Sequence, residues 1–324
     1  MAEIRISYLN VKQGDCIIFE QNTGRVSVID ICCGNLETKV IAEAKRHAKP
    51  TGDYGMRNYP TNPIDYLTSK GISEIWRFIL THPDMDHMDG IKKFFTDKKV
   101  LHFWDCGTRK DKPPFDKSKQ YLEEDWNFYS DLISNKVKDT KLITPRAGDM
   151  GKYWNADSDD NMGHGDYLSI VAPNEELISE ANKSGSVNDA SYVLVYRSPA
   201  GKIIFPGDSS DKTWEFIVNN YKSFVSDAAV LFAPHHGRKL DDFSFLDVVK
   251  PRVSFFGYAS SEHLAYSAWA NRELLYFTNN QCGNVQIYPG TGKVEVFIEN
   301  EKFANDYTSG NSHQKDGYWF LCRV

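Results

Sequence analysis

A dense run of imidazole and carboxylate side chains lies between Thr81 and Gly90. Five side chains that can bind a metal ion fall within eight residues there: His82, Asp84, Asp86, His87 and Asp89. The apolar segment 75–80 just before them is typical of a buried strand, so the run lies where α/β sheets tend to bind their ligands. Imidazole plus carboxylate suits zinc, manganese or iron. The alternative is a polar turn shaped by Asp and Pro, which does not require two histidines and three aspartates.

The chain is long enough, at 324 residues, to bury one large core or two. Its formal net charge of −6 lacks the general basic footprint of a nucleic-acid-binding protein, although a local groove could still be basic. No window approaches eighteen apolar residues, and the first residues do not resemble a signal peptide. We therefore expect a cytoplasmic protein without a membrane span. Its six cysteines form no CxxC pair and are expected to be free thiols.

Three short segments typical of strands open the chain, at 4–8, 16–20 and 25–30. The first alternates apolar and polar residues like a half-buried strand, and the tight turns between the three indicate an antiparallel meander. Residues 36–50 and 121–137 have the apolar spacing of amphipathic helices.

Polar clusters follow several of the expected strand ends, at 82–89, 207–208, 235–236 and 263. The chain divides into two halves, each of which opens with antiparallel strands and then alternates strands with helices. This repetition predicts an α/β (α+β) fold, a four-layer αββα sandwich with a site along one edge of its two sheets. We expect a single domain over residues 1–324, in which 108–162 is an insertion that caps the core.

Several motifs extend this pattern. They are Leu9-Asn10-Val11-Lys12-Gln13-Gly14-Asp15, Val28-Ile29-Asp30 with Gly34, Asn188-Asp189-Ala190-Ser191 and Pro234-His235-His236-Gly237-Arg238. Together with His82-x-Asp84-x-Asp86-His87 and Gly207-Asp208, they resemble the metallo-β-lactamase superfamily. More narrowly, they resemble the soluble hydrolase domain of ComEC-type DNA-uptake proteins and its stand-alone relatives. The resemblance covers about residues 4–290 and keeps the motifs in order.

Three positions depart from the patterns of these families. Lys12 stands where glycine is usual, and Asp84 stands where the superfamily most often has histidine. Asn188 occupies the place of a histidine that usually precedes the Gly-Asp motif. The last two departures also occur in the ComEC-like group and therefore point to that subgroup. His164 is a possible substitute for the missing histidine, or a structural residue at the start of a strand.

The resemblance implies a centre of two divalent metal ions, zinc or manganese. The ligands it implies are His82, Asp84 and Asp208 for one ion, and Asp86, His87, Asp208 and either His235 or His236 for the other. Asp208 would bridge the two ions, because a carboxylate can offer one oxygen to each.

The resemblance also implies roles beyond metal binding. The expected catalytic residues are Asp86, His236 and His263. Whichever late histidine does not bind metal would contact a phosphate or act as a general acid, and His263 would meet the leaving group. Residues expected to orient the ligands from behind are Asp30, Asp89 and Asn188.

We therefore expect a metal-dependent hydrolase, a phosphodiesterase or nuclease that uses a water activated by two metals. Its substrate would be a phosphodiester, either nucleic acid or a nucleotide. Two alternatives stay open. The same metals could hydrolyse a non-phosphate ester or lactone, or the chain could be a non-catalytic binding or sensor module with a protein partner.

Overall fold

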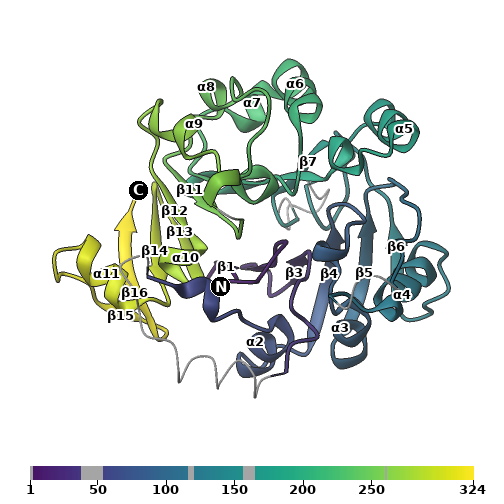
Figure 1. The fold of residues 1–324 in the computed structure, drawn as a ribbon, viewed down its shortest axis with the longest axis horizontal. Helices are drawn as coiled ribbons and strands as arrows, with labels where there is room; N and C mark the ends of the chain where they lie inside the picture. The colour runs from purple at the N-terminus through teal and green to yellow at the C-terminus, as the bar shows by residue number, and fades with distance from the viewer. Residues whose placement is uncertain (1–2, 38–53, 116–119, 156–164, 260) are drawn as a thin grey trace.

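Two β-sheets lie face to face with helices on both outer sides in the computed structural model, which describes residues 3–37, 54–115, 120–155, 165–259 and 261–324 (Figure 1). The larger sheet has the strand order β15-β16-β14-β13-β1-β2-β3-β4-β5-β6. Its strands are β1 (Arg5–Tyr8), β2 (Ile17–Glu20), β3 (Val26–Ile29), β4 (Glu74–Leu80), β5 (Lys99–Asp105), β6 (Lys141–Ile143), β13 (Val285–Gly290), β14 (Lys293–Ile298), β15 (Gln314–Lys315) and β16 (Tyr318–Arg323).

The smaller sheet has the strand order β12-β11-β10-β9-β8-β7. Its strands are β7 (Leu168–Ala172), β8 (Val193–Ser198), β9 (Gly201–Phe205), β10 (Val230–Phe232), β11 (Val253–Phe256) and β12 (Tyr276–Thr278). Strands β9 to β12 are parallel to one another, whereas β7 to β9 are antiparallel. The carboxyl ends of β9 and β10 therefore meet at one edge of this sheet.

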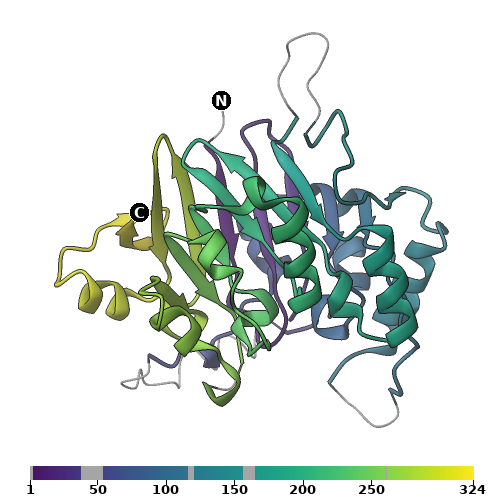
Figure 2. The ribbon, with the colours of Figure 1, turned by 90° about the horizontal axis from the view of Figure 1, so that it is seen from above.

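Helices cover the outer faces of both sheets, as Figures 1 and 2 show. The α-helices are α2 (Pro63–Ser69), α3 (Ile91–Asp97), α4 (Glu123–Ile133), α5 (Glu175–Ser184), α6 (Asp211–Asn220), α7 (Lys222–Val225), α8 (Leu246–Val249), α9 (Tyr266–Ala270), α10 (Asn279–Cys282) and α11 (Glu301–Tyr307). Asparagine caps start several of them, because an asparagine side chain can accept the first unpaired backbone N–H groups. Asn174, for example, accepts from the N–H of Leu177.

Three hydrophobic cores define the layers. The central core lies between the sheets, where Phe19 of the larger sheet contacts Phe205 of the smaller one with ring centroids 6.1 Å apart. A second core joins the outer face of the larger sheet to α2, α3 and α4, and a third joins the smaller sheet to α6, α8 and α9. The predicted four-layer αββα sandwich is confirmed.

The predicted antiparallel meander is confirmed as β1 to β3, and the helix expected at 121–137 is α4. The helix expected at 36–50 lies largely outside the described residues. Within the predicted insertion 108–162, β6 pairs in parallel with β5 and extends the larger sheet, while α4 packs against α3. All six cysteines are unpaired thiols, as expected. Across the described parts of the chain, no helix combines the length and apolarity needed to cross a membrane.

A buried ion pair ties the larger sheet to the segment that leads into β7. Arg77 of β4 is 1% exposed and donates to the Asp166 carboxylate and, over 2.8 Å, to the Tyr153 carbonyl. Arg25 donates to the same carboxylate from a partly exposed position. Burial lowers the pKa of Arg77 to about 10, while Asp166 acts in the opposite direction. Asp166 thus keeps a fully buried guanidinium charged.

We predict that Asp166→Ala lowers the free energy of unfolding by about 3–5 kcal/mol, because it leaves the Arg77 charge buried without its partner. Arg25→Ala removes the partly exposed partner of the same carboxylate and should cost at most about 1 kcal/mol. Urea unfolding of the two variants beside the parent protein measures both values. Equal losses in the two variants would contradict a buried charge pair at Arg77.

Candidate metal centre

Three loops at strand ends build the site. The loop after β4 carries His82 and His87, the loop after β9 carries Asp208, and the short helix η4 (Pro234–Gly237) after β10 carries His235 and His236. The first loop belongs to the larger sheet and the other two belong to the smaller one. The site therefore lies on the edge where the two sheets meet, as the sequence predicts.

Asp208 lies at the centre of the imidazoles. Its Oδ1 is 3.3 Å from Nε2 of His87, and its Oδ2 is 3.3 Å from Nε2 of His236. The Nε2 atoms of His235 and His82 lie 3.6 Å and 3.9 Å from Oδ2. Asp208, His82, His87 and His236 are all 3% exposed or less, whereas the His235 side chain is 29% exposed.

Unusual backbone conformations aim these side chains. His235 and His236 both have positive φ, 51° and 60°. Residues that carry a side chain adopt this region only at a cost in free energy. Gly207 also has positive φ, and a Cβ there would lie 2.8 Å from Cβ of Thr81. The loops of Thr81 and Asp208 can therefore approach each other only with glycine at position 207.

Asp30 forms a hydrogen bond with the ring nitrogen of His87 that faces away from Asp208. Its Oδ2 lies 2.8 Å from Nδ1 of His87 and also accepts the Thr81 hydroxyl over 2.6 Å. Its Oδ1 accepts the Thr81 backbone N–H over 2.7 Å. A carboxylate on Nδ1 fixes the ring so that Nε2 faces Asp208, which is how ligand histidines are commonly oriented. The predicted place of Asp30 behind a ligand agrees with this geometry.

Asp15 lies next to His236, at a longer distance than Asp30 from His87, and sequence reasoning assigned it no role. Its Oδ1 is 3.3 Å from Nδ1 of His236 and accepts the hydroxyl of Tyr8 over 2.8 Å. The signal for this role is its place at the end of the motif Leu9-Asn10-Val11-Lys12-Gln13-Gly14-Asp15. Gly14 has a further reason to be glycine, since a Cβ there would lie 1.8 Å from the backbone oxygen of Asp86.

The carboxylates and the imidazoles of the site shift one another's pKa values toward the charged forms. Burial would raise the pKa of Asp208, but His236 and His87 hold it well below its usual range. Burial would lower the pKa of His236, yet Asp208 and Asp15 raise it to about 10. Burial lowers the pKa of His82 to about 3, and His87 acts in the same direction. Asp208 is thus held as a carboxylate and His82 as a neutral imidazole, whereas the raised pKa values of His87 and His236 favour protons that a bound metal ion would displace.

The donor atoms fit a metal ion. Within the described residues, His82 Nε2, His87 Nε2, Asp208 Oδ1 and both ring nitrogens of His236 are buried without a hydrogen-bond partner. Such orphaned polar atoms are costly and rare in folded proteins. The ligand atoms of His82, His87 and Asp208 all lie within 4.8 Å of one another, and so do those of Asp86, His87 and His236. A cation shared by these atoms would give each of them a partner.

The two remaining predicted ligands lie at the rim. Asp84 Oδ2 is 3.7 Å from Nε2 of His82, while its Oδ1 forms an ion pair with Lys110. Asp86 Oδ2 is 3.9 Å from Nε2 of His236. Both side chains are about one-quarter exposed, so they face the outer side of the cluster.

Two other predicted residues, His263 and Asp89, have partners outside the cluster. His263 is 63% exposed at its side chain, with Nε2 3.8 Å from Oε1 of Glu262, although its backbone carbonyl accepts from Lys239 close to η4. Asp89 accepts from the backbone N–H of Cys33 and from the amide of Asn35. Asn188 lies in the short helix η3 (Val187–Ala190), and His164 lies outside the described residues.

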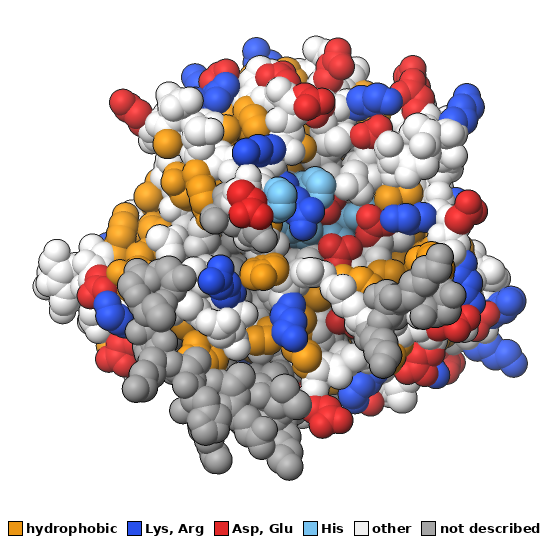
Figure 3. All heavy atoms as spheres, in the orientation of Figure 1, with side chains coloured by type: hydrophobic (Ala, Val, Ile, Leu, Met, Phe, Trp, Pro, Cys, Tyr) orange, Lys and Arg blue, Asp and Glu red, His pale blue; other side chains and the backbone are white. Residues whose placement is uncertain are grey.

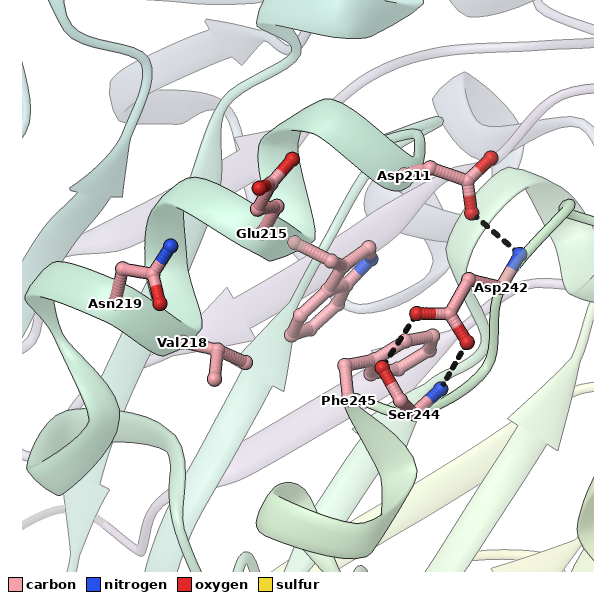
Figure 4. Close-up of a pocket in the computed structure, with 8 residues that line it drawn as sticks. Asp211, Glu215, Val218, Asn219, Asp242, Ser244 and Phe245 are labelled. Atoms are coloured by element: carbon pink, nitrogen blue, oxygen red, sulfur yellow. Dashed lines mark hydrogen bonds between the residues drawn. The ribbon is translucent and has the colours of Figure 1, made fainter.

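The cluster opens to the surface. Figure 3 shows histidine side chains in a hollow near the centre of the face it draws, with charged side chains of both signs around them. A cavity of about 440 Å³ adjoins the loop 83–86. Another cavity, of about 470 Å³, lies beside α6 (Figure 4), where Asp211 and Asp242 already accept backbone N–H groups.

No family model and no curated protein matches the chain. It is similar to solved structures at low identity. Igni18, a metallo hydrolase from Ignicoccus hospitalis, is 13% identical, with 92% of this chain and 100% of that chain covered and a TM-score of 0.43. Unliganded yeast PDE1 is 11% identical, with 86% and 97% covered and a TM-score of 0.40.

A protein from Thermotoga maritima, described as a zinc-dependent hydrolase of the metallo-β-lactamase superfamily, is 9% identical. The match covers 84% of this chain and 81% of that one, with a TM-score of 0.33. Likenesses this distant do not assign an activity, so the proposals below rest on the side chains of the site. The narrower resemblance to ComEC-type domains stays a prediction.

We predict about two divalent ions per chain in the protein as purified or after reconstitution, and their loss in Asp208→Ala, because Asp208 faces every imidazole of the cluster. Asp15→Ala and Asp30→Ala should weaken metal binding by about 10–100-fold, the usual effect of removing the residue behind a ligand histidine. Elemental analysis and titration against a metal indicator measure both quantities.

His263→Ala is the comparison variant for metal content and should keep both ions, since its exposed side chain lies outside the cluster. Loss of an ion in that variant, or retention of both ions in Asp208→Ala, would contradict this assignment of ligands.

Proposed function

We propose that the chain is a metal-dependent hydrolase that acts on phosphodiesters with two divalent ions, zinc or manganese. The observation that carries the proposal is the convergence of His82, His87 and His236 on the buried carboxylate of Asp208. Of the two late histidines, we propose His236 as the metal ligand. It is buried and backed by Asp15, whereas His235 is partly exposed.

Two divalent ions bound there would lower the pKa of a shared water and clamp a phosphoryl group. The chain itself supplies the orientation. A hydrogen bond from Asp30 fixes the His87 imidazole, and Asp15 lies 3.3 Å from Nδ1 of His236, so that Nε2 of both rings points at Asp208 before any ligand arrives. Such preorganisation reduces the reorganisation needed during the reaction.

Cationic side chains at the rim favour an anionic substrate over a neutral ester. Lys110 pairs with Asp84 on one side of the cluster. Arg238 directly follows η4 and lies close enough to His235 to lower its pKa, although burial lowers that pKa most. The Nε of Arg238 is buried and, among the described residues, makes no hydrogen bond. Guanidinium and ammonium groups recognise phosphate oxygens.

We predict that the metal-loaded protein hydrolyses bis(p-nitrophenyl) phosphate and that Asp208→Asn lowers kcat by about 10³-fold or more, a loss of about 4 kcal/mol of transition-state stabilisation. Release of p-nitrophenolate measures the rate. His313→Ala is the control, because this histidine stacks on Phe320 near the far edge of the larger sheet. It should hydrolyse the diester like the parent protein.

The alternatives predict other results. Turnover of p-nitrophenyl acetate or a lactone with no turnover of the diester would favour an esterase or lactonase. Bound metal with no turnover of any of these compounds would favour a binding or sensor module and would end the hydrolase proposal.

A further inference from the structure

The cavity of about 440 Å³ beside the metal centre has a mostly apolar wall. We call it the aromatic pocket. Its apolar lining consists of Pro83, Met85, Pro113, Pro114, Tyr121 and Trp126. The volume and lining are typical of sites that bind small organic molecules, which combine apolar and aromatic walls with a few polar groups.

The polar groups of the pocket lie on the side of the metal centre. They are Asp84, Asp86 and Lys110. Asp84 and Asp86 are two of the proposed metal ligands, so one end of the pocket opens onto the place where a phosphoryl group would bind. Lys110 adds a cation at that end. The pocket thus combines an apolar, aromatic interior with a charged end, at which the proposed metal ions and Lys110 would bind an anion.

Tyr121 is fixed in the wall by contacts with the loop that builds the site. Its hydroxyl donates to Oε1 of Gln13 over 2.9 Å. Gln13 precedes Gly14, which packs directly on the backbone of Asp86. The position of the ring is therefore set relative to the metal ligands. Trp126, on α4, is 6% exposed and packs on Tyr129 with ring centroids 5.6 Å apart.

We propose that the aromatic pocket binds the base of a nucleotide whose phosphodiester lies at the metal centre. The inference rests on the proposed function and names its substrate class. Every nucleobase is planar and can stack on aromatic side chains. The phosphate group of the nucleotide would then lie at the charged end of the pocket.

Charge and size favour a nucleotide over a long nucleic acid. The chain carries a net charge of −6, whereas binding to many phosphates of a polymer requires many cationic contacts. The aromatic pocket holds one cation, Lys110, at its charged end, among apolar side chains and two carboxylates. This lining suits one base with one phosphate group.

The test compares binding of AMP and ribose 5-phosphate to the metal-loaded protein by isothermal titration calorimetry. The two ligands share the sugar phosphate and differ in the base. AMP should bind about 10-fold or more tightly, the gain expected from stacking one base on aromatic rings. Tyr121→Ala should remove most of this preference while the affinity for ribose 5-phosphate stays unchanged. Tyr121→Phe, which keeps the ring and loses the contact with Gln13, should keep the preference.

Equal affinity of the parent protein for both ligands, or no binding of either, would overturn the pocket assignment. So would a Tyr121→Ala variant that keeps the preference for AMP, or one that loses ribose 5-phosphate binding as well, because the ring would then act on the fold rather than on the base. None of these results would contradict the hydrolysis of bis(p-nitrophenyl) phosphate or its dependence on Asp208. The two proposals therefore fail separately.

Discussion

The burial of one carboxylate among several imidazoles is the constraint on which this structure depends. Asp208 is 3% exposed, and an isolated charge at such a depth would be strongly unfavourable. Two imidazoles at 3.3 Å compensate it, and each of these is held by a further carboxylate, Asp30 or Asp15. Charges alternate outward from the centre, so each group depends on the next. Removing any member leaves a neighbour without compensation.

The two sheets are needed because no single loop can supply this arrangement. His82 and His87 come from the larger sheet, and Asp208 and His236 come from the smaller one. Large aromatic side chains of the central core fix how the sheets face each other, and Phe205 and Phe232 lie just before two of the site loops. The strands that pack the central core therefore also determine where the side chains of the candidate metal centre lie.

Much of this could be predicted from local patterns. Apolar runs followed by His or Asp marked the strand ends, so the loops of His82, Asp208 and His236 were found from the sequence. The role of Asp15 could not be found, because a Gly-Asp turn explains it locally and its partner lies far along the chain. The choice between His235 and His236 depends on their burial and on the contact of His236 with Asp15, and the exposure of His263 depends on how its turn packs. The pairing of β13 with β1 is likewise a tertiary property.

The pairing of Asp15 with His236 has a consequence for how the protein matures. One member lies near the beginning of the sequence and the other almost three-quarters of the way along it, so their contact closes a very long loop. Contacts of this kind form late, after local hairpins and helices. A nascent chain on the ribosome cannot complete the centre until the segment after β10 has emerged. A metal ion of the proposed centre would therefore bind near the end of folding, to a nearly finished chain and not to its early intermediates.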